Sequence, residues 1–136
     1  MIGIIFIVCM RCCTMEHVEA TPRMNCAVDA TMSVIEGRWK TVIMCLLLRN
    51  GPMRFNQLMR SIDGVSPRIL TKQLKEMESD GIILRTSYPE IPPRVEYSVT
   101  ERGESLAPIL KAMAEWGLRN MFQNRVSFDP EIRMED

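Results

Sequence analysis

Apolar residues recur at helical spacing from about residue 25 onward, in short segments separated by glycine and proline. The segment 25–36 predicts a helix that Asn25 caps and Gly37 ends. A second helix follows, because apolar residues take the i, i+3, i+4, i+7 and i+8 positions of a buried stripe: Trp39, Val42, Ile43, Leu46 and Leu47. The sequence "RNGP" ends this helix, since neither glycine nor proline continues a helix comfortably.

Two further helices are predicted, joined by a tight turn. Residues 53–62 indicate a third helix with four apolar residues on one face: Phe55, Leu58, Met59 and Ile62. The dipeptide "DG" that follows is typical of a turn. Ser66 then suits the N-cap of a fourth helix and Pro67 its first position, where a missing N–H costs nothing. This helix runs to about Asp80, and the segment is a helix-turn-helix candidate.

The formal net charge of the 136-residue chain is zero, which by itself predicts no polyanionic partner. The charges are unevenly distributed, however. At about 100° per residue, Leu70, Leu74 and Met77 form the buried face of the fourth helix. Its outward face carries Arg68, Thr71, Lys72 and Lys75. Between residues 54 and 75, five basic residues stand against one acidic residue, which favours nucleic-acid binding, although a basic face is also typical of ordinary solvated surface.

A hairpin is predicted directly after the fourth helix. Residues 82–87 and 95–100 are rich in β-forming side chains, and "YPEIPPR" joins them. The three prolines of this connection remove backbone donors and stiffen it, so it projects as a loop. A hairpin after a helix-turn-helix is the wing of a winged-helix domain, where Arg94 and also Arg85 could neutralise phosphate. Taken alone, the loop is equally typical of a rigid surface connection.

The last predicted helix has an apolar stripe with little left to cover. Thr100 suits its N-cap, and the helix begins or kinks near Pro108. The stripe consists of Leu106, Ile109, Leu110, Met113 and Trp116. We expect it to form a two-fold dimer interface, with folding back onto its own domain as the alternative. The predicted fold class is therefore mainly α with a small β-hairpin (α+β): a winged helix-turn-helix with an extra C-terminal dimerisation helix.

The composition fits one globular domain, with 46% hydrophobic and 25% charged residues. We expect this domain over residues 25–119, after a disordered or over-extended leader at 1–24 and before a polar tail at 120–136. The apolar start "MIGIIFIVCM" is too short to span a bilayer and lacks the pattern of a signal peptide, so no membrane association is predicted. The odd number of cysteines, five, favours a reduced, cytoplasmic setting.

Among the cysteines, Cys26 is the candidate for a switch. With Asn25 as cap it would lie in the first helical turn, where unpaired N–H groups favour the thiolate, although an inert interface side chain is the alternative. The cluster of Cys9, Cys12, Cys13 and His17 lacks a second well-spaced pair, so neither a metal nor a cofactor is predicted. With a single His, no paired carboxylates in an apolar setting and no glycine-rich phosphate loop, the sequence does not predict an enzyme.

The motifs "GRWK", "RFNQL", "ILTKQLKEME" and especially "PPRVEYSVTERG" together resemble the HxlR family of transcriptional regulators, over about residues 26–117. The resemblance implies a dimeric winged-helix protein that binds operator DNA as repressor or activator. It places the recognition helix on Ser66 to Asp80 and the family's leading cysteine on Cys26, through which several members sense electrophiles or oxidants. Ala27 departs from the family, which often has proline there, and the cysteine-bearing leader is not part of its pattern.

The sequence thus predicts a homodimeric, sequence-specific regulator whose partner is a double-stranded DNA operator, with an oxidant or small-molecule effector left open. Arg68 is the candidate for bidentate guanine readout, and the lysines are candidates for phosphate contacts. The full set of candidate DNA-binding residues is Arg54, Ser66, Arg68, Thr71, Lys72, Lys75 and Arg94. The alternative is a winged-helix module that binds protein through its apolar stripes and does not bind DNA.

Overall fold

The computed structural model describes residues 26–121, and the chain divides into two units, Met1–Glu36 and Gly37–Asp136. The described part of the first unit is a single helix, α2 (Ala27–Ile35). Its N-cap is Cys26, in extended backbone and without a capping hydrogen bond from the side chain. Cys26 therefore precedes the first turn, which corrects its predicted place within that turn; Asn25 and the leader cysteines lie outside the described residues.

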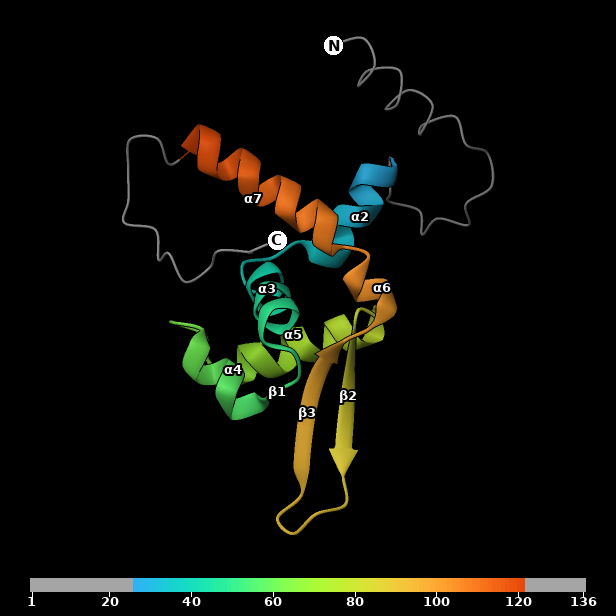
Figure 1. Cartoon of the computed structure of the whole chain (residues 1–136), viewed down its shortest axis with the longest axis vertical. Coiled ribbons are helices and arrows are strands. Elements are labelled where there is room, and N and C mark those ends of the chain that lie inside the picture. Colours follow the sequence, from blue (N-terminus) through green and yellow to red (C-terminus); the bar gives the residue numbers. More distant parts are fainter. Residues whose placement is uncertain (1–25, 122–136) are drawn as a thin grey trace. The chain divides into compact units, whose positions relative to one another are not determined.

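The second unit combines helices with a three-stranded antiparallel sheet of order β1-β3-β2 (Figure 1). Along the chain the elements are α3 (Lys40–Asn50), β1 (Met53–Arg54), α4 (Phe55–Ser61), α5 (Pro67–Ser79), β2 (Ile83–Tyr88), β3 (Arg94–Val99), α6 (Glu101–Glu104) and α7 (Ala107–Met121). The hairpin β2–β3 extends away from the helix pair α4–α5 as a wing (Figure 1). This arrangement confirms the predicted fold class of helices with a small β-hairpin.

The strand β1 is a correction to the predicted third helix, which was expected to include residue 53. Met53 pairs with Tyr97 and Arg54 with Glu96 of β3, and the helix α4 begins only at Phe55. Gly51, at a φ of 74°, turns the chain after α3 so that it can meet β3. The pairing extends the hairpin into a sheet and buries the Met53 side chain, which is 7% exposed.

The recognition-helix candidate α5 forms as its local signals predict. The Ser66 hydroxyl accepts a hydrogen bond from the Ile69 backbone N–H at 3.2 Å, and Pro67 occupies the first helical position. Gly81, at a φ of 73°, follows the C-cap. The helix packs against α3 and β2 and contributes three side chains to the core of the unit. That core consists of Ile43, Met44, Leu47, Met53, Leu58, Ile62, Val65, Leu70, Leu74, Met77, Ile82, Ile83 and Leu110.

One ion pair fixes α5 against α3 inside this packing. Lys40, at the start of α3, is 6% exposed, and its ammonium lies 3.1 Å from a carboxylate oxygen of Glu76 on α5. A buried ammonium needs such a partner, because an unpaired buried charge lowers the stability of the fold by roughly 3–5 kcal/mol. The buried face of α3 is rotated relative to the predicted apolar stripe. Met44, which was not part of that stripe, is fully buried, whereas Leu46, which was part of it, is only half-buried.

The segment "TERG" joins the sheet to the C-terminal helices. The Thr100 hydroxyl donates to the Gly81 carbonyl at 2.7 Å and accepts from the Gly103 N–H at 3.1 Å, so it caps α6 as predicted. The chain breaks between α6 and α7 near Pro108, also as predicted, and α7 runs to Met121, past the expected domain end at 119. Thr100 thereby connects the end of α5 to the start of the C-terminal helices.

We expect Gly103→Ala to destabilise the fold. A Cβ at this position would overlap the Ile82 carbonyl oxygen and lie 2.6 Å from Val99 Cγ1, so backbone would have to move. The free energy of unfolding, measured by urea denaturation, should fall by about 1–3 kcal/mol.

Gly117→Ala is the matched control, because no described atom lies within 4 Å of the added methyl group within the protomer. That variant should keep the wild-type stability or gain about 0.5–1 kcal/mol, as alanine favours helix. Equal stability of the Gly103→Ala variant and wild type would contradict the close packing of α6 on the sheet.

Candidate nucleic-acid interface

The outward face of α5 displays the predicted cationic residues. Leu70, Leu74 and Met77 are each at most 1% exposed, which fixes the rotation of the helix about its axis. The opposite side consequently faces solvent and exposes Arg68, Thr71, Lys72 and Lys75. Sequence and structure agree on this face because one strongly apolar stripe determines the other side of the same helix.

The two hydroxyls of this region are partly committed to the helix itself. The Ser66 hydroxyl accepts from the Ile69 N–H, which leaves its own proton available for a bond to a phosphate oxygen. The Thr71 hydroxyl donates to the Pro67 carbonyl at 2.8 Å, so toward a ligand it can act only as an acceptor. Thr71 is therefore suited to a base amino group and unsuited to phosphate.

The cations of α5 differ in how far they are neutralised. The Lys72 ammonium lies 3.9 Å from Glu76, which also holds the buried Lys40. Because the Lys72 side chain is 73% exposed, that pair is weak in water. Within residues 26–121, no carboxylate lies at ion-pair distance from Arg68 or Lys75. These two side chains retain their full charge toward a ligand.

Sequence reasoning missed Ile69, which is 40% exposed next to Arg68. Its position falls about 100° from the centre of the buried stripe, and this offset is the signal that could have identified it. An exposed aliphatic side chain among cations offers an apolar contact of the kind that a thymine methyl group makes.

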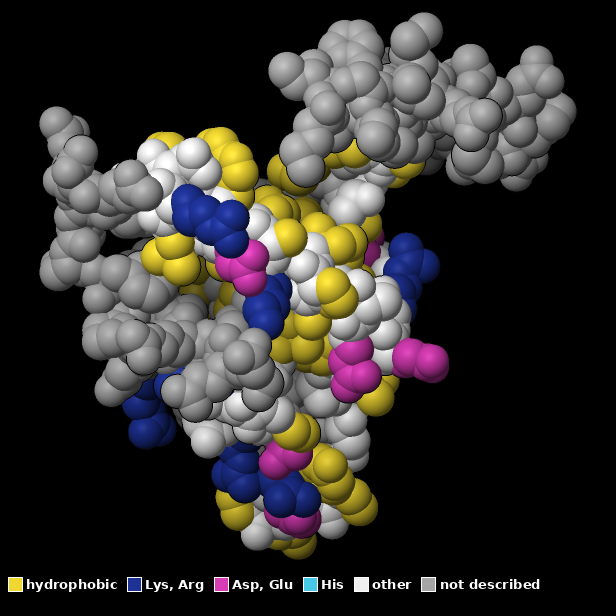
Figure 2. All heavy atoms as spheres, turned by 45° about the horizontal axis from the view of Figure 1, so that its top comes forward, with side chains coloured by type: hydrophobic (Ala, Val, Ile, Leu, Met, Phe, Trp, Pro, Cys, Tyr) yellow, Lys and Arg dark blue, Asp and Glu magenta, His cyan; other side chains and the backbone are white. Residues whose placement is uncertain are grey.

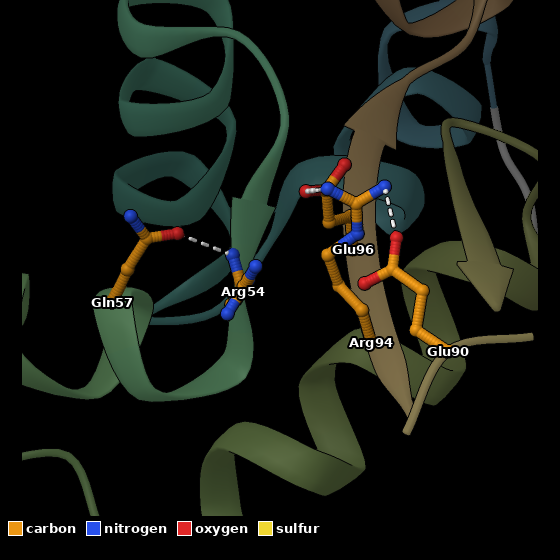
Figure 3. Close-up of polar contacts among 5 residues, drawn as sticks. All are labelled: Arg54, Gln57, Glu90, Arg94 and Glu96. Atoms are coloured by element: carbon orange, nitrogen blue, oxygen red, sulfur yellow. Dashed lines mark hydrogen bonds and ion pairs between the residues drawn. The ribbon is translucent and has the colours of Figure 1, made fainter. Parts of the chain in front are cut away.

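A polar groove of 460 Å³ lies beside the N-terminal end of α4. Its lining combines two arginines, two amides, a proline and one carboxylate: Pro52, Arg54, Asn56, Gln57, Arg60 and Glu96. The side-chain amide oxygen of Gln57 accepts from the Arg54 backbone N–H at 2.7 Å, which leaves the NH₂ group of Gln57 free as a donor (Figure 3). Of these residues the sequence analysis identified only Arg54, because the groove is created by the non-local pairing of β1 with β3.

The wing arginine Arg94 is engaged within the protein. Its guanidinium lies 3.1 Å from Glu90 and 3.8 Å from Glu96 (Figure 3), and it stacks 4.0 Å from the centroid of the Tyr88 ring. Basic and acidic side chains accordingly meet near the end of the wing in Figure 2. This geometry does not favour the predicted role of Arg94 as a free phosphate contact. Arg85 is exposed and, among the described residues, has no ion pair.

The predicted dimerisation stripe of α7 divides into two parts. Leu110 is 5% exposed on the helix that packs against α3, and Leu106 is half-buried, so at Leu110 the prediction of a dimer contact is corrected. Ile109, Met113 and Trp116 lie within about 60° of one another around the helix and are 41%, 44% and 63% exposed. Figure 2 shows hydrophobic side chains open to solvent on the face that carries α7.

Two cysteines fall in the described part of the chain, and both are free thiols. Cys26 is half-buried at the N-cap of α2. Cys45 lies in α3, where burial raises the pKa of its thiol and so favours the protonated, unreactive form.

Within residues 26–121 no group of three or more His, Cys, Asp and Glu side chains is placed to hold a metal ion. The cluster of Cys9, Cys12, Cys13 and His17 lies outside those residues. The same part of the chain contains no helix that is both long and apolar enough to cross a membrane.

Comparison with known proteins finds relatives that share this architecture. The chain is 47% identical, over 92 residues, to an HTH-type transcriptional regulator of Methanothermobacter thermautotrophicus; the match covers 68% of this chain and 70% of the relative. Among solved structures, the redox regulator HypR in its oxidised form matches with a TM-score of 0.66 and 44% identity, covering 70% of this chain and 97% of HypR. Its reduced form matches with the same TM-score and 41% identity, over 72% and 98%.

The match to a family model covers most of the described fold. Residues 34–125 fit the model of the HxlR-like helix-turn-helix, a span that includes α4, α5, the wing and α7. The helix-turn-helix and the wing found in the structure are those that the sequence motifs predicted, and the relatives are named as transcriptional regulators. The chain therefore belongs to the HxlR-like helix-turn-helix family.

Proposed function

We propose that this protein is a DNA-binding transcriptional regulator that acts as a homodimer, with α5 in the major groove of its operator. The observation that carries the proposal is the exposed cationic face of α5, held outward by its buried apolar stripe. Family membership supports it, since the relatives are named HTH-type transcriptional regulators. A role as a protein-binding module without DNA binding would instead predict no salt-dependent retention of DNA.

The exposed polar and cationic side chains of α5 divide between two roles. Arg68, whose planar guanidinium matches two acceptors on one base edge, reads guanine, and Ile69 beside it contacts a thymine methyl group. Lys72, Lys75 and the Ser66 hydroxyl bind phosphate and set the position of the helix on the duplex. Thr71 accepts from a base amino group, since its proton is used within the helix.

We expect Arg68→Ala to relax sequence preference and Lys72→Ala to weaken binding uniformly. Loss of the guanine contact should cost about 1–3 kcal/mol on the preferred operator and little on other sequences. Loss of one phosphate contact should instead lower the slope of affinity against salt by about one unit on every sequence. Selection of bound DNA sequences followed by titrations at several salt concentrations measures both effects.

Glu78→Ala is the control for those two variants, because it removes an exposed side chain of the same helix that lies beyond the cationic face. It should leave both specificity and salt dependence unchanged. Equal, sequence-independent losses in Arg68→Ala and Lys72→Ala would refute the division of roles.

The exposed stripe of α7 supports the homodimer. Ile109, Met113 and Trp116 form a row of large apolar side chains that one protomer leaves uncovered. A two-fold axis along such a row brings identical stripes together. Two copies of α5 would then meet half-sites about one helical turn, roughly 34 Å, apart.

We expect Trp116→Glu to raise the dissociation constant of the dimer by roughly tenfold or more, because a charge replaces an aromatic side chain that the dimer would bury. Sedimentation equilibrium over a range of protein concentrations measures the change. Leu118→Ser is the control, since Leu118 is 43% exposed but lies about 180° around α7 from Ile109. An unchanged dimer in the Trp116 variant would place the interface elsewhere. A monomeric wild type would exclude the homodimer.

An oxidant effector that acts through Cys26 is the regulatory part of the proposal. HypR is a redox regulator solved in oxidised and reduced forms, and this chain is similar to both. Cys26 is half-buried and begins α2, whereas Cys45 is held as a thiol by burial, which raises its pKa. Cys26 is therefore the better candidate of the two described cysteines.

We expect an oxidant to change the DNA affinity of wild type and of Cys45→Ser, but not of Cys26→Ser. The raised pKa of the Cys45 thiol keeps it protonated around neutral pH, so alkylation followed by mass spectrometry should label Cys26 faster than Cys45. A DNA response of equal size in wild type and Cys26→Ser would remove Cys26 as the sensor.

A further inference from the structure

We propose that the groove beside α4 binds a phosphate of the DNA backbone, and that Arg94 keeps it open by holding Glu96 away from Arg54. This inference rests on the proposed function, and it gives Arg94 a positioning role in place of a direct contact. The shared chemistry of the site is that of a phosphate-like anion.

The groove is lined mainly by donors. Arg54 and Arg60 have no carboxylate at ion-pair distance within the described residues, and the Gln57 and Asn56 amides add neutral donors. Two guanidiniums and two amides around one groove match the oxygens of a phosphodiester group. The groove lies at the first helix of the helix-turn-helix, the helix that crosses the DNA backbone when the second helix enters the major groove.

Glu96 is the one carboxylate of this lining, and its position makes it a competitor for Arg54. The two residues face each other across the β1–β3 pair, where directly opposed side chains are close enough to form an ion pair. The structure nevertheless pairs Glu96 with Arg94, at 3.8 Å on the same strand. Figure 3 shows the Arg94 guanidinium between Glu96 and Glu90, with Arg54 on the neighbouring strand.

Arg94 is held in this place from several sides. Glu90 lies 3.1 Å from one of its terminal nitrogens, and the Tyr88 ring stacks on its guanidinium plane. Its side chain is 30% exposed, and its buried Nε has no hydrogen-bond partner among residues 26–121. A guanidinium so enclosed has little freedom to leave Glu96 for a phosphate. Its contribution to DNA binding consequently acts through Glu96.

A double-mutant cycle on the full-length protein tests this role. Arg94→Met removes the charge but keeps the aliphatic stem against Tyr88, and it should lower DNA affinity about tenfold because Glu96 then neutralises Arg54. Glu96→Gln alone should change affinity less than about threefold, and the double variant should return to within about threefold of wild type. A direct contact by Arg94 predicts no such rescue, so an additive double variant would overturn the proposal.

Arg85 supplies the matched control. It is a wing cation on the opposite face of the hairpin. Arg85 pairs with Tyr97, which lies three residues after Arg94 on β3, and side chains an odd number of residues apart on a strand point to opposite faces. In the Arg85→Ala background, Glu96→Gln should change DNA affinity no more than it does in wild type. An equal rescue in both backgrounds would show a general charge effect and would overturn the positioning role. Thermal unfolding of each variant establishes that the wing is folded.

Two further measurements test the groove itself. Arg54→Ala and Arg60→Ala should each lower the slope of affinity against salt by about one unit on all DNA sequences. Inorganic phosphate, added at constant ionic strength, should not shift the thermal unfolding of wild type. A shift that disappears in Arg54→Ala would assign the groove to a free anion and overturn the proposal. Failure of wild type to bind any DNA at low salt would instead refute the proposed function.

Discussion

The burial of one face of α5 is the constraint on which the rest of the structure depends. Leu70, Leu74 and Met77 insert between α3 and the sheet, and the pair of Lys40 with Glu76 fixes the same helix from its side. Rotating α5 by even one residue would expose an apolar side chain and separate a buried ammonium from its carboxylate. The cationic face is therefore held rigidly in one direction, as recognition of a base edge requires.

Much of this arrangement could be predicted from sequence because its signals are local. Ser66 and Pro67 mark the start of α5 within two residues, and Gly81, which takes a positive φ in the structure, marks its end. The three prolines and the flanking β-forming segments likewise identify the wing from neighbouring residues alone. Helical periodicity then gives the outward face of α5, since the buried face is strongly apolar.

The features that sequence reasoning missed depend on partners far along the chain. The strand β1 is two residues long and exists only because β3 pairs with it. The burial of Lys40 depends on Glu76, which lies 36 residues further along the chain. The burial of Leu110 likewise depends on the packing of α7 against α3. The enclosure of Arg94 by Glu90, Glu96 and Tyr88 similarly requires the folded hairpin. No periodicity contains such information.

The placement of acidic residues explains how a chain of zero net charge can present a cationic surface. Glu76 and Glu96 hold Lys40 and Arg94 at 3.1 Å and 3.8 Å, so neither carboxylate is paired with Arg54, Arg60 or Arg68. The balanced total charge provides no net long-range attraction, and salt screens the field of exposed charges beyond about one Debye length, roughly 8–10 Å near physiological salt. Attraction to DNA must then arise from cations close to the phosphates, which makes their orientation more important than their number. The rigid orientation of α5 therefore matters more to this surface than additional lysines would.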